Sequence, residues 1–179
     1  MIGPEGQSKA KILEVRDTDN ESLLPDGLKR AFAQLLKEIP GLHEKIELTR
    51  YFLQLMLLID PDSVDGLFDI KIIERNQNRP PSEDCFTYLV GRGVDVQGFH
   101  DEMFATHTLS EEPVPGAYAL YLRDEANVLK AAHIGRVTDD LTVISKWGLS
   151  GHVYKHLPAL VPISYGSRIA YYVPQKTRK

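Results

Sequence analysis

The residues best suited to chemistry in this sequence are one cysteine and one histidine. Cys85 is the only cysteine among 179 residues, and His133 follows it in a later, apolar segment. A thiolate is a nucleophile, and an imidazole can accept its proton and return it to a leaving group. The pair therefore predicts nucleophilic acyl transfer, provided that folding brings the two side chains together.

Cys85 is predicted to lie in the first turn of a short helix. Ser82 or Asp84 can cap this helix, apolar residues follow at helical spacing, and Gly91 or Gly93 can end it. Unpaired N–H groups and the helix dipole favour a thiolate at this position. The acidic residues just before Cys85 act in the opposite direction unless they point away.

His133 is predicted to lie on a strand of an antiparallel hairpin. Residues 131–137 and 141–147 are apolar runs separated by Thr-Asp-Asp, which is typical of a turn. A histidine flanked by Ala132 and Ile134 is either a catalytic base or a buried structural residue. Neither role is favoured until Cys85 is considered.

The remaining segments predict an α+β fold with an antiparallel sheet. Two helices joined by Pro-Gly should form an antiparallel pair, and several short strands follow, after a polar arm. We expect helices at residues 22–39 and 42–59, strands at 67–73, 117–122 and 168–173, a polar connection at 98–107, and a further strand within the arm at 11–15. The expected division is an N-terminal arm and helical pair, residues 1–65, and a second domain, residues 66–179.

Three segments in this order resemble the NlpC-like cysteine peptidases and amidases. They are residues 84–86 (Asp-Cys-Phe), 115–121 (Pro-Gly-Ala-Tyr-Ala-Leu-Tyr) and 132–137 (Ala-His-Ile-Gly-Arg-Val). That family belongs to the papain-like superfamily, together with the CHAP amidohydrolases. The resemblance covers residues 68–173 and implies a papain-like domain, with the cysteine on a helix N-terminus packed on an antiparallel sheet, behind an N-terminal helical extension.

The resemblance also implies roles for individual residues. Cys85 would be the nucleophile and His133 the base, while the third polar residue, commonly a second histidine, would orient the base. Ser145 occupies that place here, with His156 as its competitor. Phe86 follows the cysteine where the family usually has serine. The implied substrates are peptide-like amides such as bacterial cell-wall peptides.

Three further residues are candidates for substrate binding: Trp147, Tyr118 and His156. Trp147 is equally well explained as a core residue. The pair His152 and His156 has the spacing of a helical metal site, but no cysteine or acidic cluster accompanies it, so we expect no metal. No phosphate loop or dinucleotide fingerprint is present, so we expect no cofactor.

Composition limits the classes of partner. The apolar fraction of 42%, the charged fraction of 26% and the net charge of −4 are typical of a soluble globular protein without general affinity for nucleic acid. No apolar run is long enough to span a membrane. With no classical signal peptide at its start, the chain is expected to be cytoplasmic, or exported by another route.

The sequence therefore predicts a thiol-dependent amide hydrolase. Two alternatives stay open. One is a papain-like binding module that has lost turnover. The other is an interaction protein that binds a protein partner through its N-terminal helices.

Overall fold

A computed structural model describes residues 24–75, 83–91, 95–148 and 151–175. Three expected features lie outside these ranges: the strand at 11–15, the cap Ser82 and the helix stop Gly93. None of the helices in the described part of the chain has the length and apolar character needed to cross a membrane.

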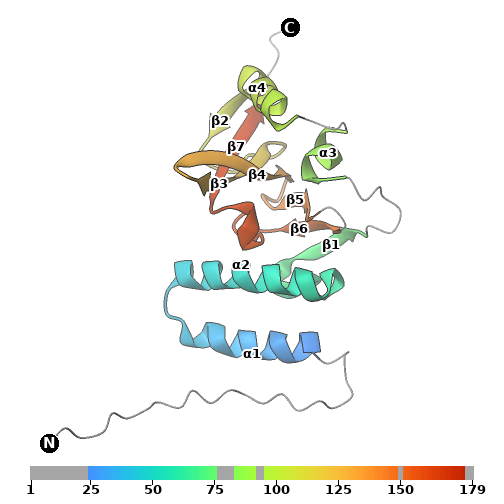
Figure 1. Cartoon of the computed structure of the whole chain (residues 1–179), viewed down its shortest axis with the longest axis vertical. Helices are drawn as coiled ribbons and strands as arrows, with labels where there is room; N and C mark the ends of the chain where they lie inside the picture. Colours follow the sequence, from blue (N-terminus) through green and yellow to red (C-terminus); the bar gives the residue numbers. More distant parts are fainter. Residues whose placement is uncertain (1–23, 76–82, 92–94, 149–150, 176–179) are drawn as a thin grey trace, which may run out of the picture.

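The N-terminal helical pair is present as predicted. Helix α1 spans Leu24–Glu38 and α2 spans Leu42–Ile59, separated by the Pro-Gly break. The two helices pack through Phe32 and Phe52, whose rings stack with centroids 4.0 Å apart. Figure 1 shows them lying antiparallel at one end of the molecule.

In the described part of the chain, the strands form one antiparallel sheet of seven, in the order β1-β6-β5-β4-β3-β7-β2. This confirms the α+β class with an antiparallel sheet. The strands are β1 (Lys71–Glu74), β2 (His107–Ser110), β3 (Tyr118–Glu125), β4 (Val128–Val137), β5 (Val143–Lys146), β6 (Val153–His156) and β7 (Arg168–Pro174).

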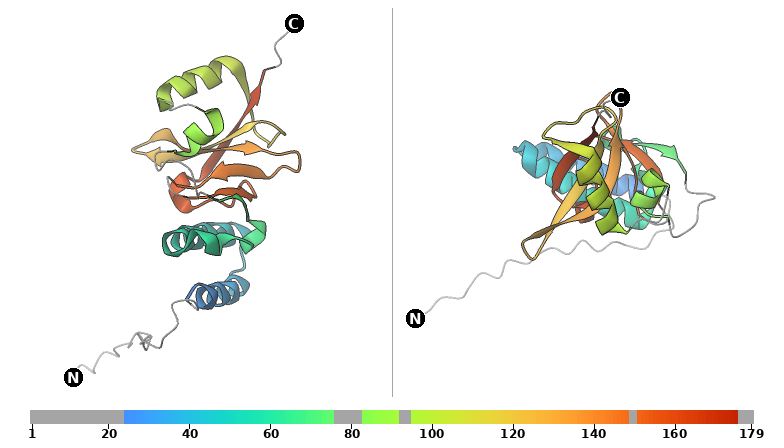
Figure 2. Two further views of the ribbon diagram at one scale, coloured as in Figure 1. Left: turned by 90° about the vertical axis from the view of Figure 1, so that its right-hand side faces the viewer. Right: turned by 90° about the horizontal axis from the view of Figure 1, so that it is seen from above.

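Helices cover both faces of the sheet. Figures 1 and 2 show α1 and α2 beyond one side of it, and α3 (Cys85–Val90) and α4 (Val96–Thr106) on the other. Neighbouring residues of one strand accordingly enter different hydrophobic clusters. Tyr121 belongs to the cluster that contains α1 and α2 residues, whereas Leu120 packs with α3 and α4 residues.

Two predicted segments differ from the structure. The region expected to be a polar connection forms α4 and then β2, because Phe99 and Met103, four residues apart, are buried against the sheet. The expected strand at 67–73 begins only at Lys71. Phe68 and Asp69 have φ of 51° and 63° in a 3₁₀ helix, Leu67–Asp69, which follows another at Pro61–Val64.

The helical pair and the sheet share one core. Leu53 and Met56 of α2 are fully buried, in a cluster that also contains Trp147 and Tyr154 of the sheet region. The expected division between residues 65 and 66 therefore separates two parts of the sequence but not two hydrophobic cores.

Candidate functional site

Cys85 is the first residue of α3, as predicted. Asp84 caps the helix, since its Oδ1 accepts a hydrogen bond of 2.7 Å from the N–H of Thr87. Gly91 ends the helix with φ of 71°, the left-handed conformation that glycine adopts without strain. Local sequence alone thus places the thiol at the helix N-terminus.

Helix α3 lies against β4 and β5. Among the described residues, these two strands pair only at Arg136–Ile144 and Val137–Val143. Cys85 packs in one hydrophobic cluster with Ile134 of β4, whose backbone N–H lowers the pKa of the thiol.

Lys146 joins the two elements at this point. Its side chain is fully buried, and Nζ donates to the carbonyl oxygens of Glu83, at 2.7 Å, and Gly148, at 3.0 Å. This contact ties the residues before α3 to the end of β5. The lysine therefore stabilises the position of the thiol.

Opposing effects set the protonation of Cys85. Burial raises the pKa of the thiol to about 11, and the nearby carboxylate of Asp84 adds to this increase. Backbone N–H groups of Ile134, Cys85 and Phe86 favour the thiolate and lower the pKa, but by less. The resting side chain is consequently a neutral thiol at neutral pH.

His133 lies on β4 next to Ile134, and its ring packs toward the other face of the strand. It stands opposite Tyr121 and stacks on Tyr165, with ring centroids 4.0 Å apart. The side chain is 1% exposed, so it does not line an open cleft. Burial, with a smaller contribution from His156, holds its pKa well below the usual value, and the ring is neutral.

The His133 ring nitrogens are not engaged. In the described part of the chain, neither Nδ1 nor Nε2 has a hydrogen-bond partner. The described structure therefore contains no hydrogen bond from this ring to Cys85, and none to Ser145. The orienting role of Ser145 toward His133 stays a prediction, which no hydrogen bond between these two described side chains supports.

Ser145 instead belongs to a chain of hydrogen bonds around His156. His156 Nδ1 lies 2.8 Å from the Leu157 carbonyl oxygen, so Nδ1 carries the proton and Nε2 accepts. The Ser145 hydroxyl then donates to Nε2 at 2.9 Å and accepts from Trp147 Nε1, also at 2.9 Å. All three side chains are buried.

This burial corrects two of the predicted substrate-binding residues. Trp147 and His156 are each 1% exposed, and Trp147 stacks on Tyr154 with ring centroids 4.4 Å apart. They are core residues and do not reach a ligand. Tyr118 is half-buried, and its hydroxyl accepts a hydrogen bond of 3.2 Å from Arg136.

Tyr165 is the residue that sequence reasoning missed. It lies in the 3₁₀ helix Ile163–Tyr165, stacks on His133, and has a pKa raised first by burial and then by the charge of Cys85. Its ring therefore covers one face of the His133 imidazole. A single tyrosine in an irregular segment has no periodicity that would have marked it.

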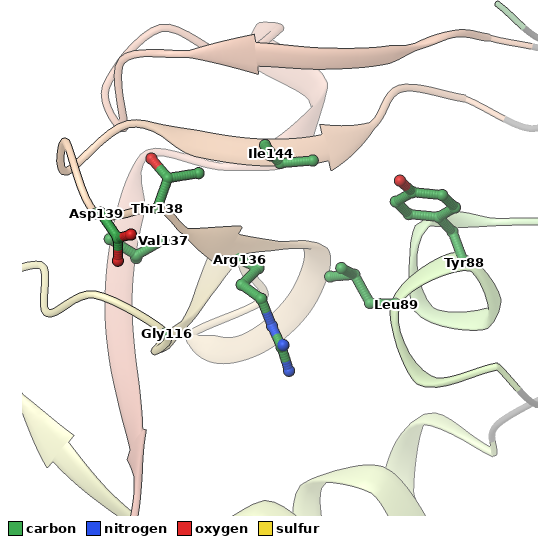
Figure 3. Close-up of a pocket in the computed structure, with 8 residues that line it drawn as sticks. All are labelled: Tyr88, Leu89, Gly116, Arg136, Val137, Thr138, Asp139 and Ile144. Atoms are coloured by element: carbon green, nitrogen blue, oxygen red, sulfur yellow. The ribbon is translucent and has the colours of Figure 1, made fainter. Parts of the chain in front are cut away.

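A cavity of about 560 Å³ opens next to α3. Figure 3 shows its lining, in which α3 contributes Tyr88 and Leu89 and the β4–β5 hairpin contributes Arg136 and Ile144. Cys85 and His133 are not among the described residues that line it.

No metal-binding group emerges from the described residues, among which no three His, Cys, Asp or Glu side chains are placed to hold an ion. Comparisons with protein-family models, with curated proteins and with solved structures found no match for this chain.

Proposed function

We propose that this protein is a thiol-dependent amide hydrolase of the papain-like kind, acting on peptide-like substrates such as cell-wall peptides. The observation that carries the proposal is the position of Cys85 as the first residue of α3. Backbone N–H groups of Ile134, Cys85 and Phe86 lower the pKa of its thiol, against the larger effect of burial. A helix N-terminus stabilises the thiolate that a nucleophile must form.

The reaction starts from a neutral Cys85 thiol and a neutral His133 imidazole. Cys85 attacks the amide carbonyl carbon while its proton passes to a ring nitrogen of His133, which has no other partner in the described structure. The N–H groups at the start of α3 stabilise the oxyanion. His133 then protonates the leaving nitrogen, the C–N bond breaks, and the amine departs from a thioester on Cys85.

Water completes the cycle. It gives a proton to His133 and attacks the thioester carbon, the C–S bond breaks, and the carboxylic acid leaves as the thiol is reprotonated. Both halves of the cycle need an imidazole nitrogen within hydrogen-bond distance of the sulfur. The His133 ring packs on the other face of β4 and stacks on Tyr165, so the reaction requires the ring to leave Tyr165 and turn toward the sulfur.

The test is acylation by p-nitrophenyl acetate, followed by nitrophenolate absorbance and intact-protein mass. We expect a burst with one acetyl group on Cys85, followed by slow turnover. His133→Gln should slow acetylation by at least about 100-fold, the usual contribution of a general base. Cys85→Ser is the control for acylation elsewhere.

Two results would overturn the proposal. One is nitrophenolate release that Cys85→Ser leaves unchanged. The other is labelling of Cys85 only at the rate of global unfolding, which would mean that the folded protein never presents the sulfur.

A binding module without turnover is the second candidate. It is favoured by the raised pKa of Cys85 and by the hydrogen bond that Ser145 makes with His156 instead of His133. It predicts that peptide-like ligands bind while the folded protein fails to acylate.

A further inference from the structure

The 560 Å³ cavity is connected to Cys85 through two elements. Tyr88 and Leu89 in its wall follow Cys85 by one helical turn of α3. Arg136 in its lining lies two residues beyond Ile134, which packs in one cluster with Cys85. Residues two apart on a strand share a face, so Arg136 and the thiol lie on the α3 side of the sheet.

Arg136 is held in place by its neighbours on the sheet. It stands opposite Tyr118 on β3 and Ile144 on β5. Its guanidinium carbon lies 5.2 Å from the centroid of the Tyr118 ring, and Nη2 donates to the hydroxyl at 3.2 Å. The side chain is exposed, and no carboxylate in the described part of the chain pairs with it.

The rest of the lining is suited to a small ligand with one negative charge. Leu89, Ile144 and Tyr88 supply apolar and aromatic walls, as expected of a site for a small organic molecule. In Figure 3 the Arg136 side chain lies between Asp139 on one side and Leu89 on the other, and it points away from Asp139. Asp139 would repel a second carboxylate, so a polyanion fits poorly.

We infer that this cavity binds a carboxylate on the substrate, through Arg136. A guanidinium donates two parallel hydrogen bonds to a carboxylate, a geometry that few other groups accept. Arg136 lies two residues of extended strand, roughly 6–7 Å, beyond Ile134, which packs with Cys85, so a carboxylate on Arg136 belongs to a part of the substrate near the sulfur. The substrate class is a peptide-like amide with an acidic side chain beside the scissile bond. The cleavage of this substrate by Cys85 rests on the proposed function, whereas the binding of a carboxylate by Arg136 does not.

Two matched ligands test the inference, N-acetyl-glutamic acid α-amide and N-acetyl-glutamine α-amide. They differ only at the end of the side chain, which is a carboxylate in the first ligand and an amide in the second. Binding is followed at low salt through backbone amide shifts of Leu89, Thr138 and Ile144. We expect the carboxylate ligand to bind about tenfold more tightly in the wild type and in Cys85→Ser.

The arginine variants identify the group responsible. Arg136→Gln should reduce the preference to within about twofold, because the charge-assisted hydrogen bonds are lost. Arg123→Gln is the matched control. Arg123 is paired with Glu125 and is not among the described residues that line the cavity, so its loss should leave the tenfold preference intact.

The inference is overturned if the wild type binds neither ligand, binds both equally, or keeps its preference in Arg136→Gln. Failure of the hydrolase proposal has a different signature. In that case Cys85 does not acylate, yet the carboxylate preference and its dependence on Arg136 persist.

Discussion

At the scale of single residues, the unusual feature is a pair of neutral histidines buried in one region. His133 and His156 are each 1% exposed. Burial lowers both pKa values, to about 4 for His156. His156 is fully hydrogen-bonded, whereas the His133 nitrogens have no partner among the described residues. An unsatisfied buried ring costs stability.

These histidines should make the fold sensitive to acid. Above pH 6.5 both are neutral whether the chain is folded or unfolded, so their contribution is constant. Below 6.5 the unfolded chain takes up protons that the folded one excludes, and unfolding becomes easier. Each histidine should cost about 1.4 kcal/mol of unfolding free energy per pH unit, down to its folded pKa.

Urea unfolding at intervals from pH 7.5 to 4.5 measures this effect. His133→Phe should reduce the steepness of the decline, and His43→Gln, at an exposed position, should not. An unchanged slope in His133→Phe would show that His133 is protonated in the folded protein.

At the scale of elements, the short helix α3 determines what the thiol experiences. Its cap, Asp84, has two separate effects. The side chain accepts the N–H of Thr87 and so stabilises the helix, while its charge raises the pKa of Cys85. A helix of six residues has few other hydrogen bonds to stabilise it.

Two substitutions separate the effects. Asp84→Asn keeps a good cap and removes the charge, so the pKa of Cys85 should fall below its value of about 11 with little loss of stability. Asp84→Ala removes both, and should lower the unfolding free energy by about 1 kcal/mol.

The measurement is the rate of iodoacetamide alkylation against pH, with urea unfolding in parallel. In the wild type the rate should keep rising through pH 10, and Asp84→Asn should shift the curve to lower pH. Glu112→Gln, an exposed change elsewhere, is the control for net charge. A curve for Asp84→Asn identical to that of the wild type would exclude the electrostatic effect.

At the scale of the whole molecule, α2 is part of the core of the sheet. Figure 2 shows it lying between α1 and the strands. Its fully buried Leu53 and Met56 cluster with Trp147, which in turn donates to Ser145. The helical pair therefore supports the region beneath the candidate site, and a partner-binding role for it would be additional.

A pair of substitutions on α2 tests this support. Met56→Ala removes a fully buried side chain and should cost about 2–5 kcal/mol of unfolding free energy. Leu58→Ala, at a position 76% exposed, should change it by less than about 0.5 kcal/mol. Chemical unfolding followed by the fluorescence of Trp147 gives both values. Equal effects of the two substitutions would mean that α2 does not share the core.

Part of this arrangement is determined by local sequence. The bounds of α2, the Asp84 cap and the Gly91 end of α3 follow from periodicity and capping, which depend only on neighbouring residues. The hairpin of β4 and β5 follows from two apolar runs around a Thr-Asp-Asp turn. The same local rules placed the cysteine at a helix start and the histidine on a strand.

Tertiary structure decided how those residues are oriented. Local patterns do not show that Cys85 packs with Ile134, that the ring of His133 packs toward the other face of its strand, or that Ser145 donates to His156. Tyr165 reaches His133 from a segment without periodicity. The pKa of the Cys85 thiol is raised mainly by burial. Burial depends on how groups distant in the sequence pack around the sulfur, so local sequence could not predict it.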